Sequence, residues 1–99
     1  MARYGVYSYP AGEGLLLDVQ SDFLDDLKTS VVVPLMASAR YQQTSDRLNP
    51  SFFIAETEYH MMTQFIASVQ QMELGQQITQ LAHEHDRIRD ALDMLLHGF

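Results

Sequence analysis

The hydrophobic period of this chain changes at Leu74, and that change limits its fold more than any other feature. Before Leu74, short apolar runs alternate with turn residues, as expected of β-strands. After it, leucines and isoleucines recur at spacings of three, four or seven residues, which is typical of an amphipathic helix. Strands followed by one helix indicate an α+β or mainly β fold: a curved antiparallel sheet with a C-terminal α-helix packed on it.

Six strands are expected in the first part of the chain. Their approximate ranges are 3–9, 15–21, 31–36, 51–55, 59–65 and 67–72. The first two should pair as a hairpin across the turn at 10–14, and the fourth and fifth should pair around residues 56–58. Pro34 has no N–H to give to a ladder, so the third strand should lie at an edge of the sheet or carry a bulge.

The helical period by itself predicts one continuous helix from about Gln76 to His97, ended by Gly98. One polar face of this helix combines carboxylates and a histidine, a combination that could in principle bind a metal ion. Binary patterning produces such faces routinely, so we expect an ordinary solvated face and no metal site. Its members are Asp86, Asp90, Asp93 and His97.

The charge balance bears on the partners of the protein. Six basic residues stand against thirteen acidic ones, a net charge of −7. Nucleic-acid binding depends on Lys and Arg that neutralise phosphates, so direct contact with DNA or RNA is not expected. The alternative is a local patch of Arg3, Arg40 and Arg47 acting against the global field. A partner protein that is itself basic would suit this charge better.

Several absences narrow the class of protein further. Without cysteine there can be no disulfide or thiolate metal site, and no apolar run reaches the 18 residues of a membrane span. We therefore expect a cytoplasmic protein whose residues 1–99 form a single domain. The sequence contains no Gly-x-Ser-x-Gly elbow, complete phosphate-binding loop or helical zinc motif. The protein is therefore not expected to be an enzyme or to carry a cofactor.

Apolar residues stand out at positions where exposure is expected. Phe23 and Leu24 lie within an acidic turn, Leu96 falls off the buried stripe of the helix, and Phe99 is the last residue. Exposed apolar side chains that gather into a patch mark protein interfaces. Gly98 adds a position without a Cβ, where a partner can approach closely. These residues predict a protein-binding surface that includes the C-terminal end.

Five segments carry, in order and spacing, the pattern of a known family. They are Leu16 to Asp22, Val32 to Arg40 with Met36 as an apparent extra residue, Met61 to Thr63, Ala67 to Val69, and Ile88 to Phe99. These segments resemble the CcdB toxins, the toxin half of a bacterial toxin–antitoxin pair. The resemblance covers nearly the whole chain. It implies an SH3-like, barrel-type antiparallel sheet shared with the MazF and Kid ribonuclease toxins, a C-terminal helix beginning near Ala82 or His83, and a homodimer.

The resemblance also implies a function. CcdB toxins poison DNA gyrase: their C-terminal tripeptide inserts at the dimer interface of the gyrase A subunits and traps the enzyme while DNA is cleaved. The disordered tail of a CcdA-like antitoxin covers part of the same surface and removes the toxin from gyrase. By position, the implied gyrase-binding residues are Phe23, Leu24, Asp93, Leu96, His97, Gly98 and Phe99.

Two positions depart from the best-known member of the family. His97 replaces its tryptophan and Phe99 replaces its terminal isoleucine, while Gly98 is retained. Two alternative functions follow. One is an endoribonuclease of the MazF or Kid type, which would need an acid–base pair and basic residues such as Arg40 or Arg47. The other is a CcdB homologue that binds its antitoxin but no longer poisons gyrase.

Overall fold

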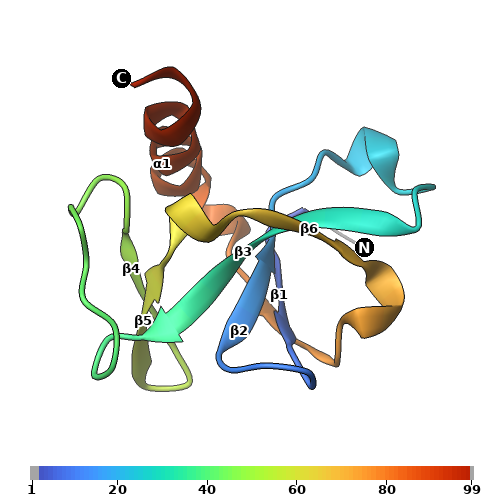
Figure 1. The fold of residues 1–99 in the computed structure, drawn as a ribbon, viewed down its shortest axis with the longest axis horizontal. Coiled ribbons are helices and arrows are strands. Elements are labelled where there is room, and N and C mark those ends of the chain that lie inside the picture. The colour runs from blue at the N-terminus through green and yellow to red at the C-terminus, as the bar shows by residue number, and fades with distance from the viewer. Residues whose placement is uncertain (1–2, 99) are drawn as a thin grey trace.

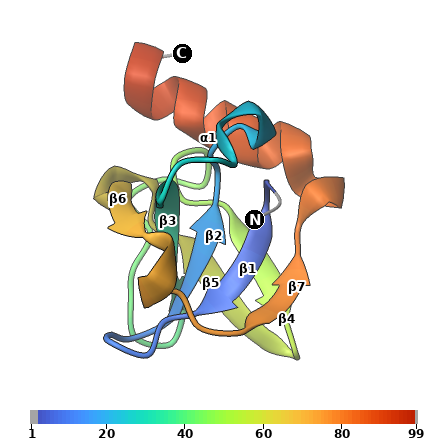
Figure 2. The ribbon, with the colours of Figure 1, turned by 90° about the vertical axis from the view of Figure 1, so that its right-hand side faces the viewer.

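An antiparallel sheet curls into a half-barrel, and a C-terminal helix packs against it, as Figures 1 and 2 show. The computed structural model describes residues 3–98, and the expected fold class is confirmed over that range. The strands are β1 Gly5–Ser8, β2 Leu15–Asp18, β3 Thr29–Ala37, β4 Ser51–Ile54, β5 Thr57–Met61, β6 Ala67–Gln70 and β7 Gln77–Gln80. The helices are α1 His85–His97 and the short 3-10 helices η1 Asp22–Leu24, η2 Thr63–Phe65, η3 Gln71–Glu73 and η4 Ala82–Glu84.

Strand β3 is the longest strand and organises the sheet. The strand order is β4-β5-β3-β2-β1-β7, and β6 pairs with β3 as well. One side of β3 pairs with β2, while the other side pairs with β5 near its C-terminal end and with β6 near its N-terminal end. Both expected hairpins, β1 with β2 and β4 with β5, are present.

The prediction that Pro34 lies in an edge strand is wrong, because β3 is flanked on both sides. The Pro34 carbonyl oxygen accepts a hydrogen bond from the Met62 N–H at 2.9 Å. In a strand the N and the C=O of one residue point to the same side, so the proline nitrogen also faces Met62. At that point β5 has ended and β6 has not begun. The missing N–H therefore falls between two partner strands, where no ladder bond is lost.

The continuous helix predicted from about Gln76 is also wrong. Residues Gln77–Gln80 form β7 and pair with β1, and the Leu81 N–H donates to the Tyr4 carbonyl oxygen at 2.8 Å. Tertiary pairing here overrides a helical spacing of apolar residues. The helical part begins with η4 at Ala82 and continues as α1, as the family resemblance implied.

Helix α1 attaches to the sheet through its apolar face. Ile88 and Ala91, three residues apart on one face, are fully buried. The sheet contributes the rest of the core, including Val6, Leu17, Val33, Leu35, Phe52 and Met61. Gly98 ends the helix in the left-handed conformation (φ 80°), and its N–H donates to the Met94 carbonyl oxygen at 3.0 Å, which confirms its predicted role. Across residues 3–98, no helix is long and apolar enough to span a bilayer.

Candidate functional site

The C-terminal end of α1 stands clear of the sheet (Figure 1). The Leu96 side chain is 66% exposed, His97 and Gly98 are exposed, and Asp93 is half-buried. A Cβ at Gly98 would meet no heavy atom within 4 Å among the described residues. Of the predicted tip residues, Phe99 lies outside the described range. The described part of the tip thus presents the apolar side chain of Leu96 and the accessible backbone of Gly98. Both lie at the end of a helix that is anchored in the core through its earlier residues.

Phe23 and Leu24 belong to a second exposed segment. The N–H of Phe23 donates to the Ser21 hydroxyl oxygen at 3.2 Å, which shapes η1 so that the Phe23 ring projects outward, 99% exposed. In Figure 1 this blue-to-cyan loop lies on the opposite side of the molecule from the end of α1. A single chain therefore exposes both predicted groups but does not bring them together.

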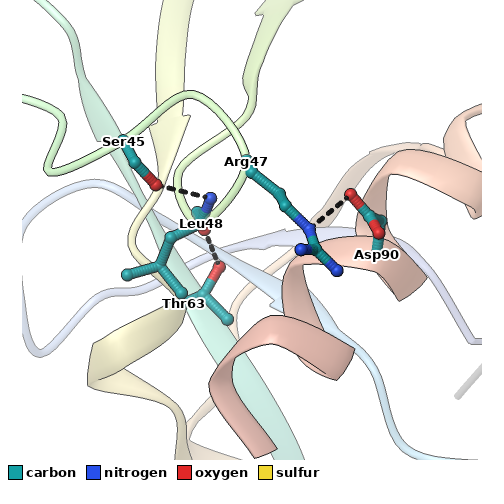
Figure 3. A network of polar contacts seen from close by, with 5 residues as sticks. All are labelled: Ser45, Arg47, Leu48, Thr63 and Asp90. Carbon is teal, nitrogen blue, oxygen red and sulfur yellow. Dashed lines mark hydrogen bonds and ion pairs between the residues drawn. The ribbon is translucent and has the colours of Figure 1, made fainter. Parts of the chain in front are cut away.

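A third feature is a polar pocket of about 360 Å³ beside the middle of α1, lined by Asp46, Arg47, Pro50, Arg87 and Asp90. Arg47 Nε donates to Asp90 Oδ2 at 3.1 Å, as Figure 3 shows. The loop that carries Arg47 is fixed beneath it: the Leu48 N–H donates to Ser45 Oγ at 3.0 Å, and the buried Thr63 hydroxyl donates to the Leu48 carbonyl oxygen at 2.6 Å.

Arg87 forms the other cationic wall of this pocket. Its Nη2 donates to the Ser51 carbonyl oxygen at 3.0 Å, and its Nη1 lies 3.3 Å from Glu84 Oε2. The guanidinium carbon lies 4.8 Å from the centroid of the Phe52 ring, a cation–π contact. These contacts fix the orientation of the guanidinium. The guanidinium groups of Arg47 and Arg87 thus lie in one pocket, and each has a carboxylate beside it.

The three arginines of the alternative basic patch do not form a shared set of contacts. Arg3 lies over the Tyr4 ring and Arg40 pairs with Glu13, whereas Arg47 pairs with Asp90. The sequence analysis missed Arg87. Its local partner Glu84 does not mark a pocket, and its other partners Ser51 and Phe52 are more than thirty residues away in the chain.

One hydroxyl–imidazole contact was also missed. Ser51 Oγ lies 2.8 Å from Nδ1 of the buried His60, its cross-strand partner in β5. Gln43 Nε2 donates to the same hydroxyl oxygen at 3.2 Å. Which residues on neighbouring strands face each other depends on the strand register. The register of this pair was not predicted from the sequence. Gln43 thereby links the loop at 38–50 to β4, next to the Arg47–Arg87 pocket.

The structure combines a half-barrel with a terminal helix whose C-terminal end is exposed. The chain belongs to the CcdB family, whose model, described as CcdB protein, matches residues 3–98. A similar solved structure is an endoribonuclease in complex with its cognate antitoxin from a mycobacterial species. It has a TM-score of 0.78 and 20% sequence identity, and the match covers 97% of this chain and 94% of that chain.

This comparison corrects one prediction. The sequence analysis expected no enzymatic activity, because no catalytic motif was found. A protein with the same fold over 97% of this chain is an endoribonuclease, so the lack of a local motif does not exclude catalysis. Side chains far apart in the sequence can meet in one pocket, as Arg47 from the loop at 38–50 and Arg87 from α1 do.

Proposed function

We propose that this chain is the toxin of a toxin–antitoxin module, that it binds the A subunit of DNA gyrase through the C-terminal end of α1, and that it traps the gyrase–DNA cleavage complex. Membership of the CcdB family over residues 3–98 carries the proposal. A CcdA-like antitoxin is the proposed neutralising partner, and the endoribonuclease of similar fold is likewise bound to a cognate antitoxin.

The build of α1 supports this role physically. Ile88 and Ala91 anchor the helix in the core, and the helix extends from them as a stiff element to Leu96. A rigid, pre-formed helix loses little conformational entropy when it binds, which favours affinity. Leu96 then offers apolar area, and Gly98 allows close approach of a partner surface. In this proposal Asp93 and His97 flank the contact and Phe99 completes it.

We further propose that the active form is a homodimer, as the family resemblance implies. Within one chain, the loop that carries η1 lies apart from the C-terminal end of α1 (Figure 1). A gyrase surface that contacts both groups must therefore either extend across the chain or combine the tip of one chain with segments of a second. A dimer with its C-terminal segments near the two-fold axis would present two tips together.

A cleavage assay tests the gyrase proposal. The purified full chain is mixed with gyrase, ATP and supercoiled plasmid, and the products are released with detergent and protease. We expect linear DNA with covalently attached protein. Leu96→Glu and deletion of residues 98–99 should abolish this product, whereas Met72→Glu, at an exposed apolar position on another loop, should not. Intact plasmid in the presence of active gyrase would refute the proposal.

A second candidate function is endoribonuclease activity, favoured by the fold shared with a known endoribonuclease. The Arg47–Arg87 pocket is the place where an RNA phosphate could be held between two guanidinium groups. Single-stranded RNA incubated with the chain should then be cleaved, and Arg47→Ala and Arg87→Ala should each reduce cleavage strongly. Arg40→Ala is the matched control, because Arg40 pairs with Glu13 elsewhere. Uncleaved RNA, or equal loss in all three variants, would exclude this pocket as the catalytic site.

A further inference from the structure

The half-barrel is open, and its two free edges border the same pocket. Strands β4 and β7 stand at the two ends of the strand order. Between them lies a pocket of about 320 Å³, lined by Phe53, Ile54 and Ala55 on one side and by residues 78–81 and His83 on the other. Figure 2 places β4 and β7 together at the lower right, away from the C-terminal end of α1. The pocket is therefore distinct from the surface proposed to bind gyrase.

On the β4 side, the backbone of Phe53 faces out of the sheet. Phe53 lies opposite Glu58 in the register, but the Glu58 carbonyl oxygen accepts from Ser38 N–H at 2.9 Å, on the other side of β5. The two residues therefore form a non-hydrogen-bonded pair, and the N–H and C=O of Phe53 point to the open edge. The preceding outward carbonyl, that of Ser51, is already bonded to Arg87. The open part of β4 is thus centred on Phe53.

On the β7 side, the backbone of Gln80 has the same outward direction. The Leu81 N–H donates to the Tyr4 carbonyl oxygen at 2.8 Å, so Leu81 faces β1. Since neighbouring residues in a strand point to opposite sides, the N–H and C=O of Gln80 point away from β1. The pocket therefore has outward backbone donors and acceptors on both of its walls.

Two apolar side chains of this pocket are exposed. Phe53 is 72% exposed and Ile78 is 47% exposed. An open edge with exposed apolar side chains pairs readily with an additional strand. The hairpin turn beside the pocket carries the exposed Glu56, and the whole chain has a net charge of −7. A guest segment with a basic residue at that end would be favoured electrostatically.

We propose that this pocket binds an extended segment of another protein by strand addition. The segment bonds to the outward groups of Phe53 or Gln80, places an apolar side chain between Phe53 and Ile78, and sets a lysine or arginine beside Glu56. The site is separate from the proposed gyrase surface, so the proposal does not depend on gyrase binding.

A synthetic peptide of alternating valine and threonine with a lysine at each end serves as the probe. It is titrated into the full chain and followed by amide NMR and hydrogen exchange. The amides of Phe53 and Gln80 exchange rapidly in the free chain because they face the open edge, and at least one of them should become protected on binding. Ile78→Glu should weaken binding by about tenfold or more, and Met72→Glu, at an exposed position outside the pocket, should leave it unchanged.

A second probe keeps the test decisive if Ile78→Glu unfolds the chain. The same peptide with all of its backbone nitrogens methylated loses its donors on both edges but keeps its side chains, and it should no longer bind the wild-type chain. Equal binding of the methylated peptide, or protection confined to amides outside the pocket, would overturn the proposal. A third outcome would also overturn it: the amides of Phe53 and Gln80 are protected without peptide, and sedimentation shows that the chain is a dimer. A second copy of the chain would then fill the pocket.

Discussion

At the scale of single residues, Asp18 is the buried carboxylate with the most distinctive environment. One of its oxygens accepts from the Gln20 N–H and from Ser30 Oγ, both at 3.0 Å. Burial raises the pKa of Asp18 above its ordinary value, and the two hydrogen bonds offset part of that shift. Asp18 therefore holds a proton more tightly in the folded chain than in the unfolded chain.

The upward shift of the Asp18 pKa predicts that the free energy of unfolding depends on pH. A raised pKa in the folded state means that the stabilising contribution of Asp18 is complete below its ordinary pKa and is lost as the pH rises through the raised value. Asp18→Asn keeps an oxygen to accept both hydrogen bonds and removes the titration. Urea unfolding at about pH 4 and about pH 7 should show the variant gaining stability relative to wild type at the higher pH. A difference that does not change with pH would contradict this.

The residue scale also shows how far sequence patterns reach. Strand alternation puts Leu15, Leu17 and Val19 on one face, and all three lie in the core. It did not indicate that Leu16 and Asp18, on the other face, are buried as well. Alternation identifies which residues share a face, but the covering of that face depends on segments distant in the sequence.

At the scale of elements, the turn between β4 and β5 carries local strain. Ala55 and Glu56 both have positive φ, 50° and 68°, in a two-residue connection between Ile54 and Thr57. The turn was predicted around residues 56–58, one residue too late, because neither Ala nor Glu signals a left-handed conformation. The double change Ala55→Asn and Glu56→Gly should stabilise the chain by about 1–2 kcal/mol, measured by urea unfolding. Glu56→Gln, which changes only the charge, should give little of this gain.

The packing of α1 gives a second prediction at this scale. Ile88→Ala removes a fully buried side chain and should lower the free energy of unfolding by about 2–5 kcal/mol. Leu96→Ala on the same helix is the control, because Leu96 faces solvent, and its effect should stay within about 0.5 kcal/mol. Equal losses in thermal or urea unfolding would mean that the end of α1 is packed and not free.

Elements with a local signal were predicted well, and those that depend on distant pairing were not. The hairpins and β6 follow from turn residues and apolar runs, whereas periodicity indicated the final helix but placed its start too early. Strand β7 does not, because its conformation is set by pairing with β1, about seventy residues earlier. The candidate sites divide in the same way. The exposure of Leu96 and Phe23 was foreseen from pattern, whereas the Arg47–Asp90 pair arises only when the loop at 38–50 lies against α1.

At the scale of the whole molecule, the chain exposes many large apolar side chains for its size. They include Phe23, Leu24, Phe53, Phe65, Met72 and Leu96. The homodimer proposed above would cover part of this apolar area if several of these side chains gather at its interface. We expect sedimentation equilibrium at micromolar concentration to give the mass of two 11.3 kDa chains. A single-chain mass under the same conditions would contradict the homodimer and would leave the gyrase proposal to be judged on the cleavage assay alone.

Strand β3 pairs with two strands on the same side, and this limits where residues can be inserted into the chain or deleted from it. Residues 62–66 join β5 to β6, and both strands pair with the same side of β3. One residue gained or lost there would either displace the fully buried Thr63 or shift one of the two strands along β3. The loop at 38–50 has no ladder to keep in register. In related sequences, insertions and deletions should therefore occur in that loop and not in the linker at 62–66.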